Sequence, residues 1–470
     1  MTHPIGSNQL DPNLQTAPPN TNPFPDLDTL ESKLKNHPQD VVDNYSESFD
    51  EFHDSPNTPK KSDTSNGQVL LLLFLSVFVD LIGFGVIAPL MPFIAETFGA
   101  SPLQVTQLFA LYSLMQLIFT PFWGYLSDRI GRRPILLMCY LGSCISYVLF
   151  AFSPNLTLIF MTRALAGITG SSITVTKAYI ADITTPENRA KGMGIIGAAF
   201  GCGFMVGPAL GGLLAGSREN PNFQLPLLVA AGLALAAFTF ALVALPESLP
   251  KQLLQKKREQ RQSNSKPSKR FNLRTVLRVL KPIQIRRLVS ISFLFSLASV
   301  GVQAILVLWC ERQFDWGPRP LGILFMFYGI IATVIQGGLI GVLTSRFKEQ
   351  TLLLIGIIFQ GFGLLVAPLS TTVALLVLGT SIWVVGESVC RPALNSLTSR
   401  IASDDEQGIT LGVAQSFMSG ANIFGPILAG WLFMKFGGQW SFWAGTIMMI
   451  VATILGLQFK RAGLQAVARQ

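Results

Sequence analysis

The sequence GYLSDRIGRRP, residues 124–134, concentrates charge in a chain that has little of it. Four charged side chains fall within positions 128–133, although Asp, Glu, Lys and Arg together make up 13% of the 470 residues. Long apolar runs precede and follow the stretch, near 104–126 and 134–153. A charged turn between two such runs indicates a connection that returns the chain from a membrane surface into the membrane.

These two apolar runs belong to a series that extends from about residue 69 to 460. Half of all residues are hydrophobic and the mean hydropathy is +0.46, which is more apolar surface than a soluble core of this size hides. The lengths fit membrane-spanning helices of roughly 20 residues and do not show the period of two of barrel strands. The sequence therefore predicts an all-α membrane protein with twelve transmembrane helices, near 69–95, 104–126, 134–153, 156–183, 193–216, 225–246, 288–310, 320–344, 351–368, 372–395, 409–434 and 440–459.

Basic residues set the expected orientation. The stretch 247–287 contains 13 basic and 2 acidic residues, so the positive-inside rule places it in the cytoplasm. Counting spans outward from this stretch places GYLSDRIGRRP and both termini in the cytoplasm as well. The basic stretch joins two apolar helices and lacks aromatic interleaving, so we expect no nucleic-acid partner.

The first 67 residues differ in composition from the rest. They are rich in Pro, Asn, Ser and Asp, and they carry 11 acidic and 4 basic residues. Such a segment buries too little apolar surface to fold, so we expect a disordered acidic tail. All three histidines lie in it, and the five cysteines are dispersed among the apolar runs without metal-ligand spacing. We expect no metal site and no cofactor.

Two landmarks indicate an internal repeat. Gly207-Pro208 recurs as Gly425-Pro426, and the loop that begins at Gly124 recurs at Gly341 as GVLTSRFKEQ, so the offsets are 218 and 217. Repeated helical halves that meet at a central site are typical of secondary transporters. The predicted organisation is a tail (1–67), an N-terminal six-helix bundle (68–246), a basic cytoplasmic linker (247–287), a C-terminal six-helix bundle (288–460) and a cytoplasmic tail (461–470).

Several motifs resemble those of one family. GYLSDRIGRRP resembles the loop motif of the major facilitator superfamily, and GAAFGCGFMVGPALGG (197–212) resembles the fifth-helix Gly-Pro motif of its proton-driven drug exporters. RALAGITG (163–170) is similar to their fourth-helix motif. The spacing from Asp80 to Pro92 and the stretch PALNSLTSRIASDDEQG (392–408) resemble tetracycline-efflux proteins. The resemblance covers about residues 69–460 and implies a drug/proton antiporter of that fold.

Ionisable residues within the predicted spans are functional candidates, because each costs at least about 2.5 kcal/mol at the helix centre. Asp80 lies near mid-depth of the first span, and Arg163 and Lys177 follow one face of the fourth. A buried carboxyl group binds a proton more readily as it loses water and releases it as a cation approaches. We predict that Asp80 carries protons and that Arg163 or Lys177 modulates it. A static buried ion pair is the alternative.

Glu387 and Arg391 in the tenth span are four residues apart, the spacing at which side chains on a helix meet. They form either a self-neutralising pair or a second ionisable site for transport. The residues alone leave both interpretations open.

The charged loop has a second expected role. Anchoring at the cytoplasmic surface explains its arginines, but it explains neither Asp128 nor the glycines. The family resemblance implies that the loop closes a cytoplasmic gate between the halves, together with the end of the fourth helix. The gate residues implied in this way are Gly124, Asp128, Arg129, Gly131, Arg132, Arg133, Asp182 and Arg189. The second copy has Ser345 where Asp would fall, which predicts one strong latch and one weak latch.

The glycines of the fifth span remove side chains and so permit close approach of a neighbouring helix, while the proline removes a backbone hydrogen bond. The resemblance implies that this antiporter Gly-Pro helix joins the halves and limits leakage. Its residues are Gly197, Gly201, Gly203, Gly207, Pro208, Gly211 and Gly212.

Two departures from the tetracycline-efflux pattern concern the substrate. The acidic residues of the third and ninth helices in that group correspond to Ser146 and to about Gln360 here. Their absence argues against tetracycline itself.

We predict a secondary active transporter, not an enzyme, that exports a small amphipathic solute or drug by alternating access and uses a proton gradient. An importer or metabolite exchanger of the same fold, or a non-transporting membrane scaffold or sensor, are the alternatives. The expected partners are a small-molecule substrate and the lipid bilayer, and the expected form is a monomer in the cell (inner) membrane.

Overall fold

The computed structural model describes residues 63–249, 273–401 and 407–467. These residues form helices joined by short turns, with no strand among them, so the prediction of an all-α membrane protein is confirmed. Twelve helical segments in the described ranges are long and apolar enough to cross a membrane. The predictions for residues 1–62, for the linker at 250–272 and for residues 468–470 lie outside the described residues.

The N-terminal half contains the first six spans. The second span opens with a capping box, in which the Ser101 side chain accepts from the Gln104 N–H and the Gln104 side chain accepts from the Ser101 N–H. The helices of this half are α3 (Asp63–Ile87), α4 (Met91–Thr97), α5 (Pro102–Ile130), α6 (Arg132–Ala151), α7 (Leu156–Thr169), α8 (Ser172–Ile183), α9 (Pro186–Ala215) and α10 (Gln224–Ala244).

The C-terminal half contains the other six spans, preceded by a short helix at the end of the predicted linker. Its helical segments are α12 (Leu273–Val279), α13 (Ile283–Phe314), α14 (Pro318–Val334), the π-helix η1 (Ile335–Leu339), α15 (Ile340–Arg346), α16 (Glu349–Val366), the 3-10 turn η2 (Ala367–Leu369), α17 (Val373–Ile401), α18 (Gln407–Phe436) and α19 (Gly438–Val467).

Three of the predicted apolar runs are not single continuous α-helices. The run 69–95 is divided at Pro89 into α3 and α4, and the run 156–183 is divided at Gly170 and Ser171 into α7 and α8. The run 320–344 passes through the π-helix η1. Hydropathy does not reveal these interruptions, because most residues at each one are apolar or small, and Gln336 in η1 is a single polar residue within an apolar run.

Close glycine contacts recur in both halves. A Cβ on Gly85 of α3 would lie 3.2 Å from Gly207 Cα of α9, and a Cβ on Gly301 of α13 would lie 2.8 Å from the Gly425 carbonyl oxygen of α18. Gly207 and Gly425 are the two glycines of the repeated Gly-Pro landmark. The first span therefore packs on the fifth as the seventh packs on the eleventh, as expected for a repeat.

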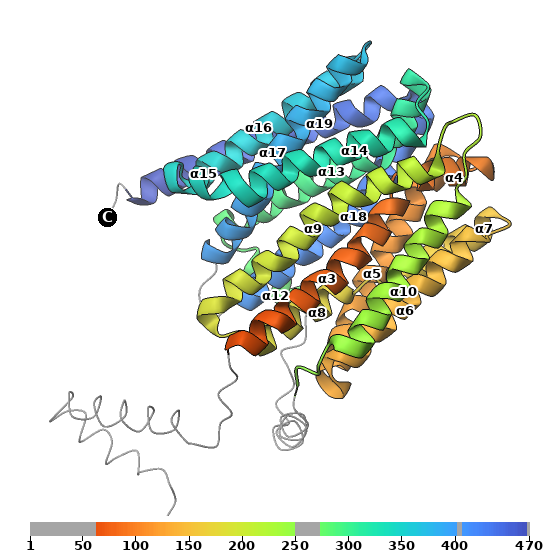
Figure 1. Cartoon of the computed structure of the whole chain (residues 1–470). Coiled ribbons are helices and arrows are strands. Elements are labelled where there is room, and N and C mark those ends of the chain that lie inside the picture. The colour runs from red at the N-terminus through yellow and green to blue at the C-terminus, as the bar shows by residue number, and fades with distance from the viewer. Residues whose placement is uncertain (1–62, 250–272, 402–406, 468–470) are drawn as a thin grey trace, which may run out of the picture. The chain divides into compact units, whose positions relative to one another are not determined.

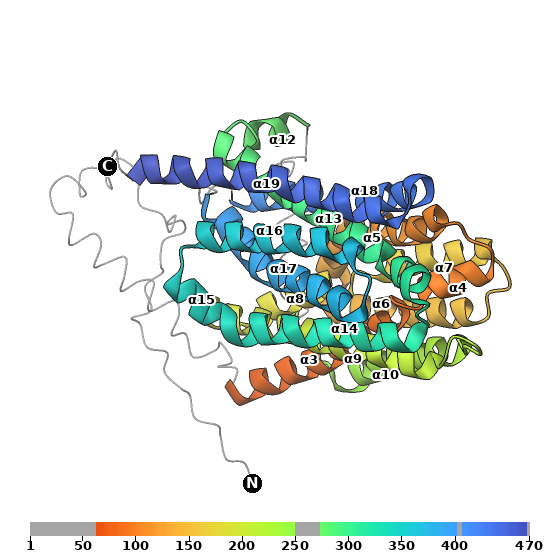
Figure 2. The same cartoon turned by 90° about the horizontal axis from the view of Figure 1, so that it is seen from above.

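In the described residues the halves contact each other mainly through two helix pairs, α9 with α14 and α5 with α18, and α5 also contacts α13. Figures 1 and 2 show α9 between α3 of its own half and α14 of the other. At the α9–α14 contact, a Cβ on Gly212 would lie 2.9 Å from Gly322 Cα. At the α5–α18 contact, Gly430 packs directly on the Thr106 side chain. Small residues thus let the backbones of the two halves approach closely.

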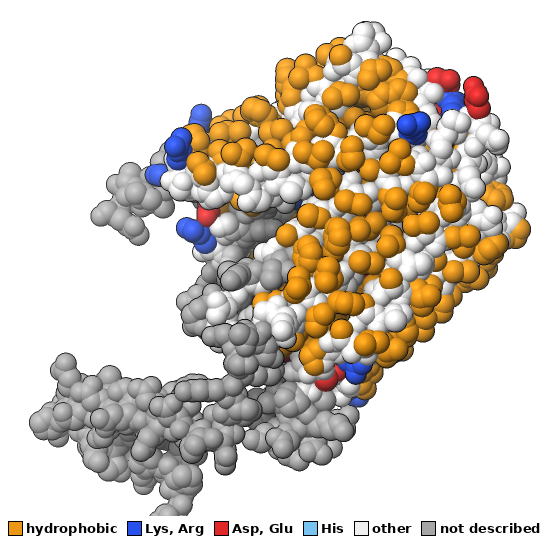
Figure 3. Space-filling model, viewed as in Figure 1, with side chains coloured by type: hydrophobic (Ala, Val, Ile, Leu, Met, Phe, Trp, Pro, Cys, Tyr) orange, Lys and Arg blue, Asp and Glu red, His pale blue; other side chains and the backbone are white. Residues whose placement is uncertain are grey.

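The surface of the bundle is apolar between two charged ends. Figure 3 shows hydrophobic side chains over the middle of the helices, whereas Lys, Arg, Asp and Glu side chains lie towards their ends. Leu235, Val243 and Phe327 are among the large apolar residues that are exposed on the described helices. Exposed side chains of this size face lipid in a membrane protein.

Candidate functional site

The fourth span is interrupted at its centre. α7 ends at Thr169 and α8 begins at Ser172, so Gly170 and Ser171 separate two half-helices. Gly170 admits no side chain, because a Cβ there would lie 2.6 Å from the Tyr112 hydroxyl oxygen of α5. Glycine at this position therefore permits the close approach of the Tyr112 side chain to the break.

Side chains of α5 bind the backbone that the interruption exposes. Gln116 Nε2 donates to the Gly170 carbonyl at 2.6 Å, and Trp123 Nε1 donates to the Ile168 carbonyl at 2.6 Å. The Thr120 hydroxyl lies 3.0 Å from the Ser171 hydroxyl. Backbone polar groups inside a membrane need partners of this kind, because no water replaces them. Side chains of α5 thus stabilise the break between α7 and α8.

Asp80 of α3 lies beside the N-terminus of α8. Its Oδ2 atom accepts a hydrogen bond from the Ser172 hydroxyl at 2.9 Å. Among the ion pairs of the described residues, none involves Asp80. The carboxyl group therefore has a hydroxyl donor and a helix N-terminus as its neighbours, and not the cation that the sequence suggested.

The two predicted cationic partners of Asp80 lie elsewhere in this structure. Arg163 is 2% exposed, and its guanidinium stacks over the Phe150 ring at 4.7 Å. Its Nε and Nη2 atoms are buried without a hydrogen-bond partner in the described part of the chain. Lys177 is exposed and makes no ion pair with a described residue. The expected pairing of Asp80 with either residue is absent from this conformation.

Glu387 and Arg391 of α17 form the ion pair that their spacing allows. Arg391 Nε and Nη2 donate to the same Glu387 carboxylate oxygen at 2.9 and 2.6 Å. Their side chains are 23% and 41% exposed, so the pair is neither fully buried nor free in solvent. In this conformation the two residues neutralise each other.

Arg132 organises the charged loop. Its side chain is 7% exposed and binds Asp128 at 2.7 Å, Asp182 at 2.9 Å and the Ser127 hydroxyl at 2.6 Å. Arg129 lies over the Tyr125 ring, and Gly131 adopts φ +108°, a region that favours glycine. Each of these contacts joins residues of the N-terminal half.

The remaining predicted gate residues take different positions. Arg133 Nη2 donates to the Leu242 carbonyl at the end of α10. A Cβ on Gly124 would meet no atom within 4 Å. The side chain of Arg189 lies outside the described residues.

Glu247 is a member of this cluster that sequence reasoning missed. Its carboxylate accepts the backbone N–H groups of Arg132 at 2.8 Å and Arg133 at 3.1 Å. It therefore caps the N-terminus of α6, where a negative charge stabilises the helix. A side chain on Gly131 would collide with the same carboxylate. The available signal was that Glu247 is one of two acidic residues in a stretch with 13 basic residues, and stands at its first position.

The repeat of this loop has the same ion pair with exchanged signs. Arg132 corresponds to Glu349 at the offset of 217, and Asp182 corresponds to Arg400 at 218. Glu349 and Arg400 lie 3.2 Å apart, and Glu349 also accepts from the Ser396 hydroxyl at 2.7 Å. In both halves an ion pair thus connects the start of the third spanning helix to the end of the fourth. Ser345 replaces Asp128, and its hydroxyl donates to the Val342 carbonyl.

The Gly-Pro helix α9 contacts both halves through different glycines. Gly203, Gly207 and Gly211 face α3, where a Cβ on Gly203 would lie 2.7 Å from Leu81 Cβ. Gly201 and Gly212 face α14. A Cβ on Gly197 would meet no atom within 4 Å. The glycines therefore permit two close helix contacts on two sides of one helix.

A second set of ion pairs joins the halves at the opposite end of the bundle. Arg218, after α9, pairs with Asp315 and lies 3.7 Å from Glu311 of α13. Arg312 of α13 lies 3.4 Å from Glu96 of α4. The spacing of these residues in the sequence does not indicate that their partners belong to the other half.

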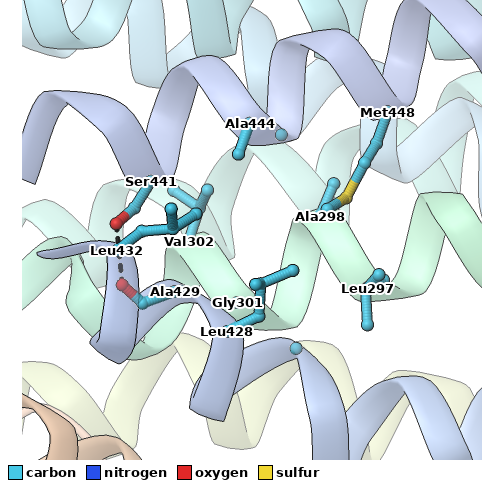
Figure 4. Close-up of a pocket in the computed structure, with 12 residues that line it drawn as sticks. Leu297, Ala298, Gly301, Val302, Leu428, Ala429, Leu432, Ser441, Ala444 and Met448 are labelled. Carbon is cyan, nitrogen blue, oxygen red and sulfur yellow. Dashed lines mark hydrogen bonds between the residues drawn. The ribbon is translucent and has the colours of Figure 1, made fainter. Parts of the chain in front are cut away.

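A small pocket in the C-terminal half contains none of these groups. Figure 4 shows it between α13, α18 and α19, lined by apolar and small side chains such as Leu297, Val302 and Met448. Ser441 donates its hydroxyl to the Ala429 carbonyl at 2.8 Å. No group of His, Cys, Asp and Glu in the described residues has the arrangement of a metal site.

Twelve spans in two similar halves, with ionisable side chains inside them, define a membrane transporter. The chain belongs to the Major Facilitator Superfamily, whose family model matches residues 73–353 and 289–465. The resemblance carried by the loop and the Gly-Pro helix is thereby confirmed. Proteins of this family are transporters and not enzymes, and this chain is an integral multi-pass membrane protein.

Relatives by sequence include proteins named for drug resistance. The chain is 29% identical to the class C tetracycline resistance protein of Escherichia coli over 80% of this chain and 92% of that protein. It is 30% identical to the class G tetracycline resistance protein of Vibrio anguillarum over 82% and 95%. It is 28% identical to multidrug resistance protein 2 of Bacillus subtilis (strain 168) over 80% and 91%.

Solved structures share the fold. The human organic anion transporter MFSD10 (TETRAN) matches with a TM-score of 0.62 and 23% identity over 83% of this chain and 99% of that chain. A bacterial homologue of the human lysosomal transporter Spinster, in an inward-facing and unoccupied conformation, matches with a TM-score of 0.70 and 17% identity, over 86% and 98%.

Proposed function

We propose that this protein exports a small amphipathic solute in exchange for protons by alternating access, across the cell (inner) membrane. The observation that carries the proposal is Asp80, a carboxyl group in a mid-membrane position whose hydrogen bond comes from a neutral hydroxyl. A carboxyl group without a cation can gain and lose a proton without breaking an ion pair. The similarity to tetracycline and multidrug resistance proteins supports export as the direction.

The contacts between the halves support an inward-open state. At one end of the bundle the halves are joined by ion pairs of Arg218 and Arg312 and by the Gly212–Gly322 contact. Towards the other end of the eighth span, a Cβ on Gly338 or Gly341 would meet no atom within 4 Å. With the basic stretch and both termini in the cytoplasm, the packed end is the external one.

Aromatic residues next to Asp80 support an amphipathic substrate. The Phe84 ring of α3 lies 5.6 Å from the Tyr112 ring and 5.9 Å from the Phe204 ring, measured between centroids. A flat apolar solute can pack against rings of this kind, and a nearby ionisable group fixes its orientation. We propose a monomer that takes such a solute from the cytoplasm or the inner leaflet, with no cofactor besides the proton gradient and no nucleic-acid partner.

Tetracycline itself is not the proposed substrate. The hydroxyl of Ser146, where the resemblance places an acidic residue, donates to the Thr162 carbonyl at 2.8 Å. Gln360 is 0% exposed, and its Nε2 donates to the Ser299 hydroxyl at 2.7 Å. Both positions are engaged in contacts between helices of the protein, so neither supplies the missing charge.

Asp80→Asn is expected to abolish proton-coupled transport. An amide keeps the size of the side chain and can still accept from Ser172, but it binds no proton in the physiological range. In everted membrane vesicles with an imposed pH gradient, tetracycline and a panel of amphipathic fluorescent dyes serve as probes. The wild type should take up at least one dye and release protons on its addition, and Asp80→Asn should lose both by about 100-fold.

Glu219→Gln is the matched control for this experiment. It makes the same change from carboxyl to amide at an exposed position outside the spans, and wild-type transport is expected. Proton-driven accumulation by Asp80→Asn at the wild-type rate would remove Asp80 from the coupling role. Dye flux in the opposite direction under the same gradient would favour an importer.

A further inference from the structure

We propose that the interruption of the fourth span is part of the proton site, and that Ser172 is the positioning residue that holds Asp80 in its charged form. The proposal rests on the proposed function, because it concerns how the proton carrier named there is controlled. In this arrangement the N-terminus of α8 and a proton compete for the same carboxylate oxygen atoms.

The geometry of α8 supports this role. α8 has 12 residues, and the N–H groups of its first residues, Ser172 and Ile173, precede the first backbone bonds of the helix, which Thr174 and Val175 donate to the Ser171 carbonyl at 3.1 and 3.3 Å. Its N-cap residue, Ser171, makes no side-chain hydrogen bond to the helix, so the usual internal cap is absent. Ser172, the first residue of the helix, donates its hydroxyl to Asp80 at 2.9 Å. A carboxylate at a helix N-terminus is stabilised by the helix dipole, and more so when partly buried.

The interruption places this N-terminus inside the membrane. A continuous fourth helix would have its only N-terminus at Leu156, some 16 residues and roughly 24 Å away at 1.5 Å per residue. Gln116, Thr120 and Trp123 lie on one face of α5 and bind the backbone or side chains at the break. Three such contacts at successive turns indicate that the break is a built feature of the helix pair.

The other groups around Asp80 do not carry a charge that stabilises its carboxylate. The contact with Ser172 and the N-terminus of α8 is therefore the main stabilising contact of the charged form. The titratable side chains that interact electrostatically with Asp80 lie on α5 and α6 and are Tyr112, Cys139, Tyr140 and Tyr147. Phenols and thiols carry no charge near neutral pH in their usual range. α10, which also packs on α3, contains no ionisable residue, and the spanning part of α9 at 192–215 contains only Cys202.

Arg163 is the buried cation of the fourth span, and its place in the cluster is separate. The other cation of that span, Lys177 of α8, is exposed and forms no ion pair with a described residue. It interacts electrostatically with Tyr112 and Tyr147 and stacks on Phe150, and it forms no ion pair with Asp80 in the described structure. Its charge therefore does not replace the α8 N-terminus as the partner of the Asp80 carboxylate in this conformation.

The competition gives a simple cycle for the carboxyl group. When Asp80 binds a proton it becomes neutral, and the attraction of the α8 N-terminus for its charge is lost. When the proton leaves, the carboxylate is again held by Ser172 and by the helix dipole. Only the charged form of Asp80 is stabilised by its contact with α8. Protonation of Asp80 would thus be linked to a shift of α3 relative to α8.

Ser172→Ala tests the proposal. Removing a donor to the charged carboxylate favours its protonated form, so the pH of half-maximal transport should rise by about one unit, a tenfold change in proton affinity. The infrared C=O band of the protonated carboxyl group, identified by its loss in Asp80→Asn, should titrate at a correspondingly higher pH. Ser172→Thr keeps the hydroxyl and should return both readouts to wild-type values.

Ser292→Ala is the matched control. Ser292 is also a buried serine of a spanning helix, 2% exposed, and its hydroxyl bonds the Leu288 carbonyl of its own helix. It should leave both pH readouts unchanged. If Ser172→Ala is not recovered folded, Ser172→Cys takes its place, with a weaker donor and the same expected direction.

Folded Ser172→Ala or Ser172→Cys with the wild-type infrared titration would overturn the proposal, because a merely structural hydroxyl lowers the yield without moving the pH. The infrared readout also separates the two claims. If Asp80→Asn transports normally, the proposed function fails, yet the titration of Asp80 still reports whether Ser172 holds its charged form.

Discussion

Gly212→Val should reduce transport by about 10- to 100-fold while leaving the protein folded. A Cβ at this position would lie 2.6 Å from the Pro318 carbonyl oxygen and 2.9 Å from Gly322 Cα. A Cβ on Gly322 would in turn lie 2.6 Å from the Pro208 carbonyl oxygen. The obstacles on both sides are backbone atoms, so they cannot move aside as a flexible side chain does.

The expected magnitude follows from the cost of overpacking. Inserted methyl groups in a tight contact typically cost about 1–3 kcal/mol, and 1.4 kcal/mol changes a population tenfold. That cost falls on the state in which α9 and α14 touch. The contacts of α9 with α3, through Gly203 and Gly207, lie on another side of the helix and are not changed. The substitution therefore disfavours one conformation and spares the N-terminal half.

Transport in everted vesicles and the distance between spin labels at positions 219 and 323 measure this effect. The distance should lengthen in Gly212→Val as the external ends separate. Gly232→Val is the matched control, because a Cβ on Gly232 of α10 meets no atom within 4 Å. Equal transport by the two variants would mean that the α9–α14 contact has no part in the transport cycle.

The sequence predicted the helices because hydropathy records each residue's preference for lipid or water, which is a local property. It did not predict the break at Gly170, because the residues on both sides are apolar enough to continue a helix. That break explains why Arg163 and Lys177, which were expected beside Asp80, do not pair with it in this conformation. Both residues were placed on one face of a continuous helix, whereas the structure has two half-helices with separate registers.

The contacts that sequence reasoning missed are long-range. Glu247 binds the backbone of Arg132, 115 positions earlier in the chain, and Arg312 pairs with Glu96, 216 positions earlier. No spacing rule connects residues so far apart, because their proximity depends on how helices pack. By contrast, the Glu387–Arg391 pair and the Gly-Pro repeat were visible in the sequence, since each depends on a fixed spacing.

Arg132→Ala is expected to lower the free energy of unfolding by about 3 kcal/mol. The Arg132 side chain is 7% exposed and neutralises two carboxylates, Asp128 and Asp182. Removing one partner from a buried ionic cluster leaves uncompensated charge, which is the costly case. Thermal unfolding in detergent micelles measures the loss. Arg400→Ala, whose side chain is 74% exposed, is the counterpart in the other half and should cost far less.

The ion pair of one half has the opposite signs of the ion pair in the other. A variant that exchanges the signs in the N-terminal half therefore tests stability and gating separately. The triple variant Asp128→Ser, Arg132→Glu and Asp182→Arg reproduces in the N-terminal half the residues Ser345, Glu349 and Arg400 of the other. Its new ion pair should recover about half of the stability lost in Arg132→Ala, because exchanged signs attract equally. The recovery of stability is partial because the carboxylate of Glu247 already lies at the N-terminus of α6, where it would repel a glutamate at position 132.

Transport by the triple variant decides the role of Asp128. If Asp128 is the latch of the cytoplasmic gate, restoring the ion pair should restore folding without restoring flux, and transport should stay at least about tenfold below wild type in vesicles. The variant Arg132→Glu with Asp182→Arg, which keeps Asp128, is the control for the exchange itself. Full transport by the triple variant would mean that the loop needs only a paired helix end, because Asp128 is the one charge that the exchange does not replace.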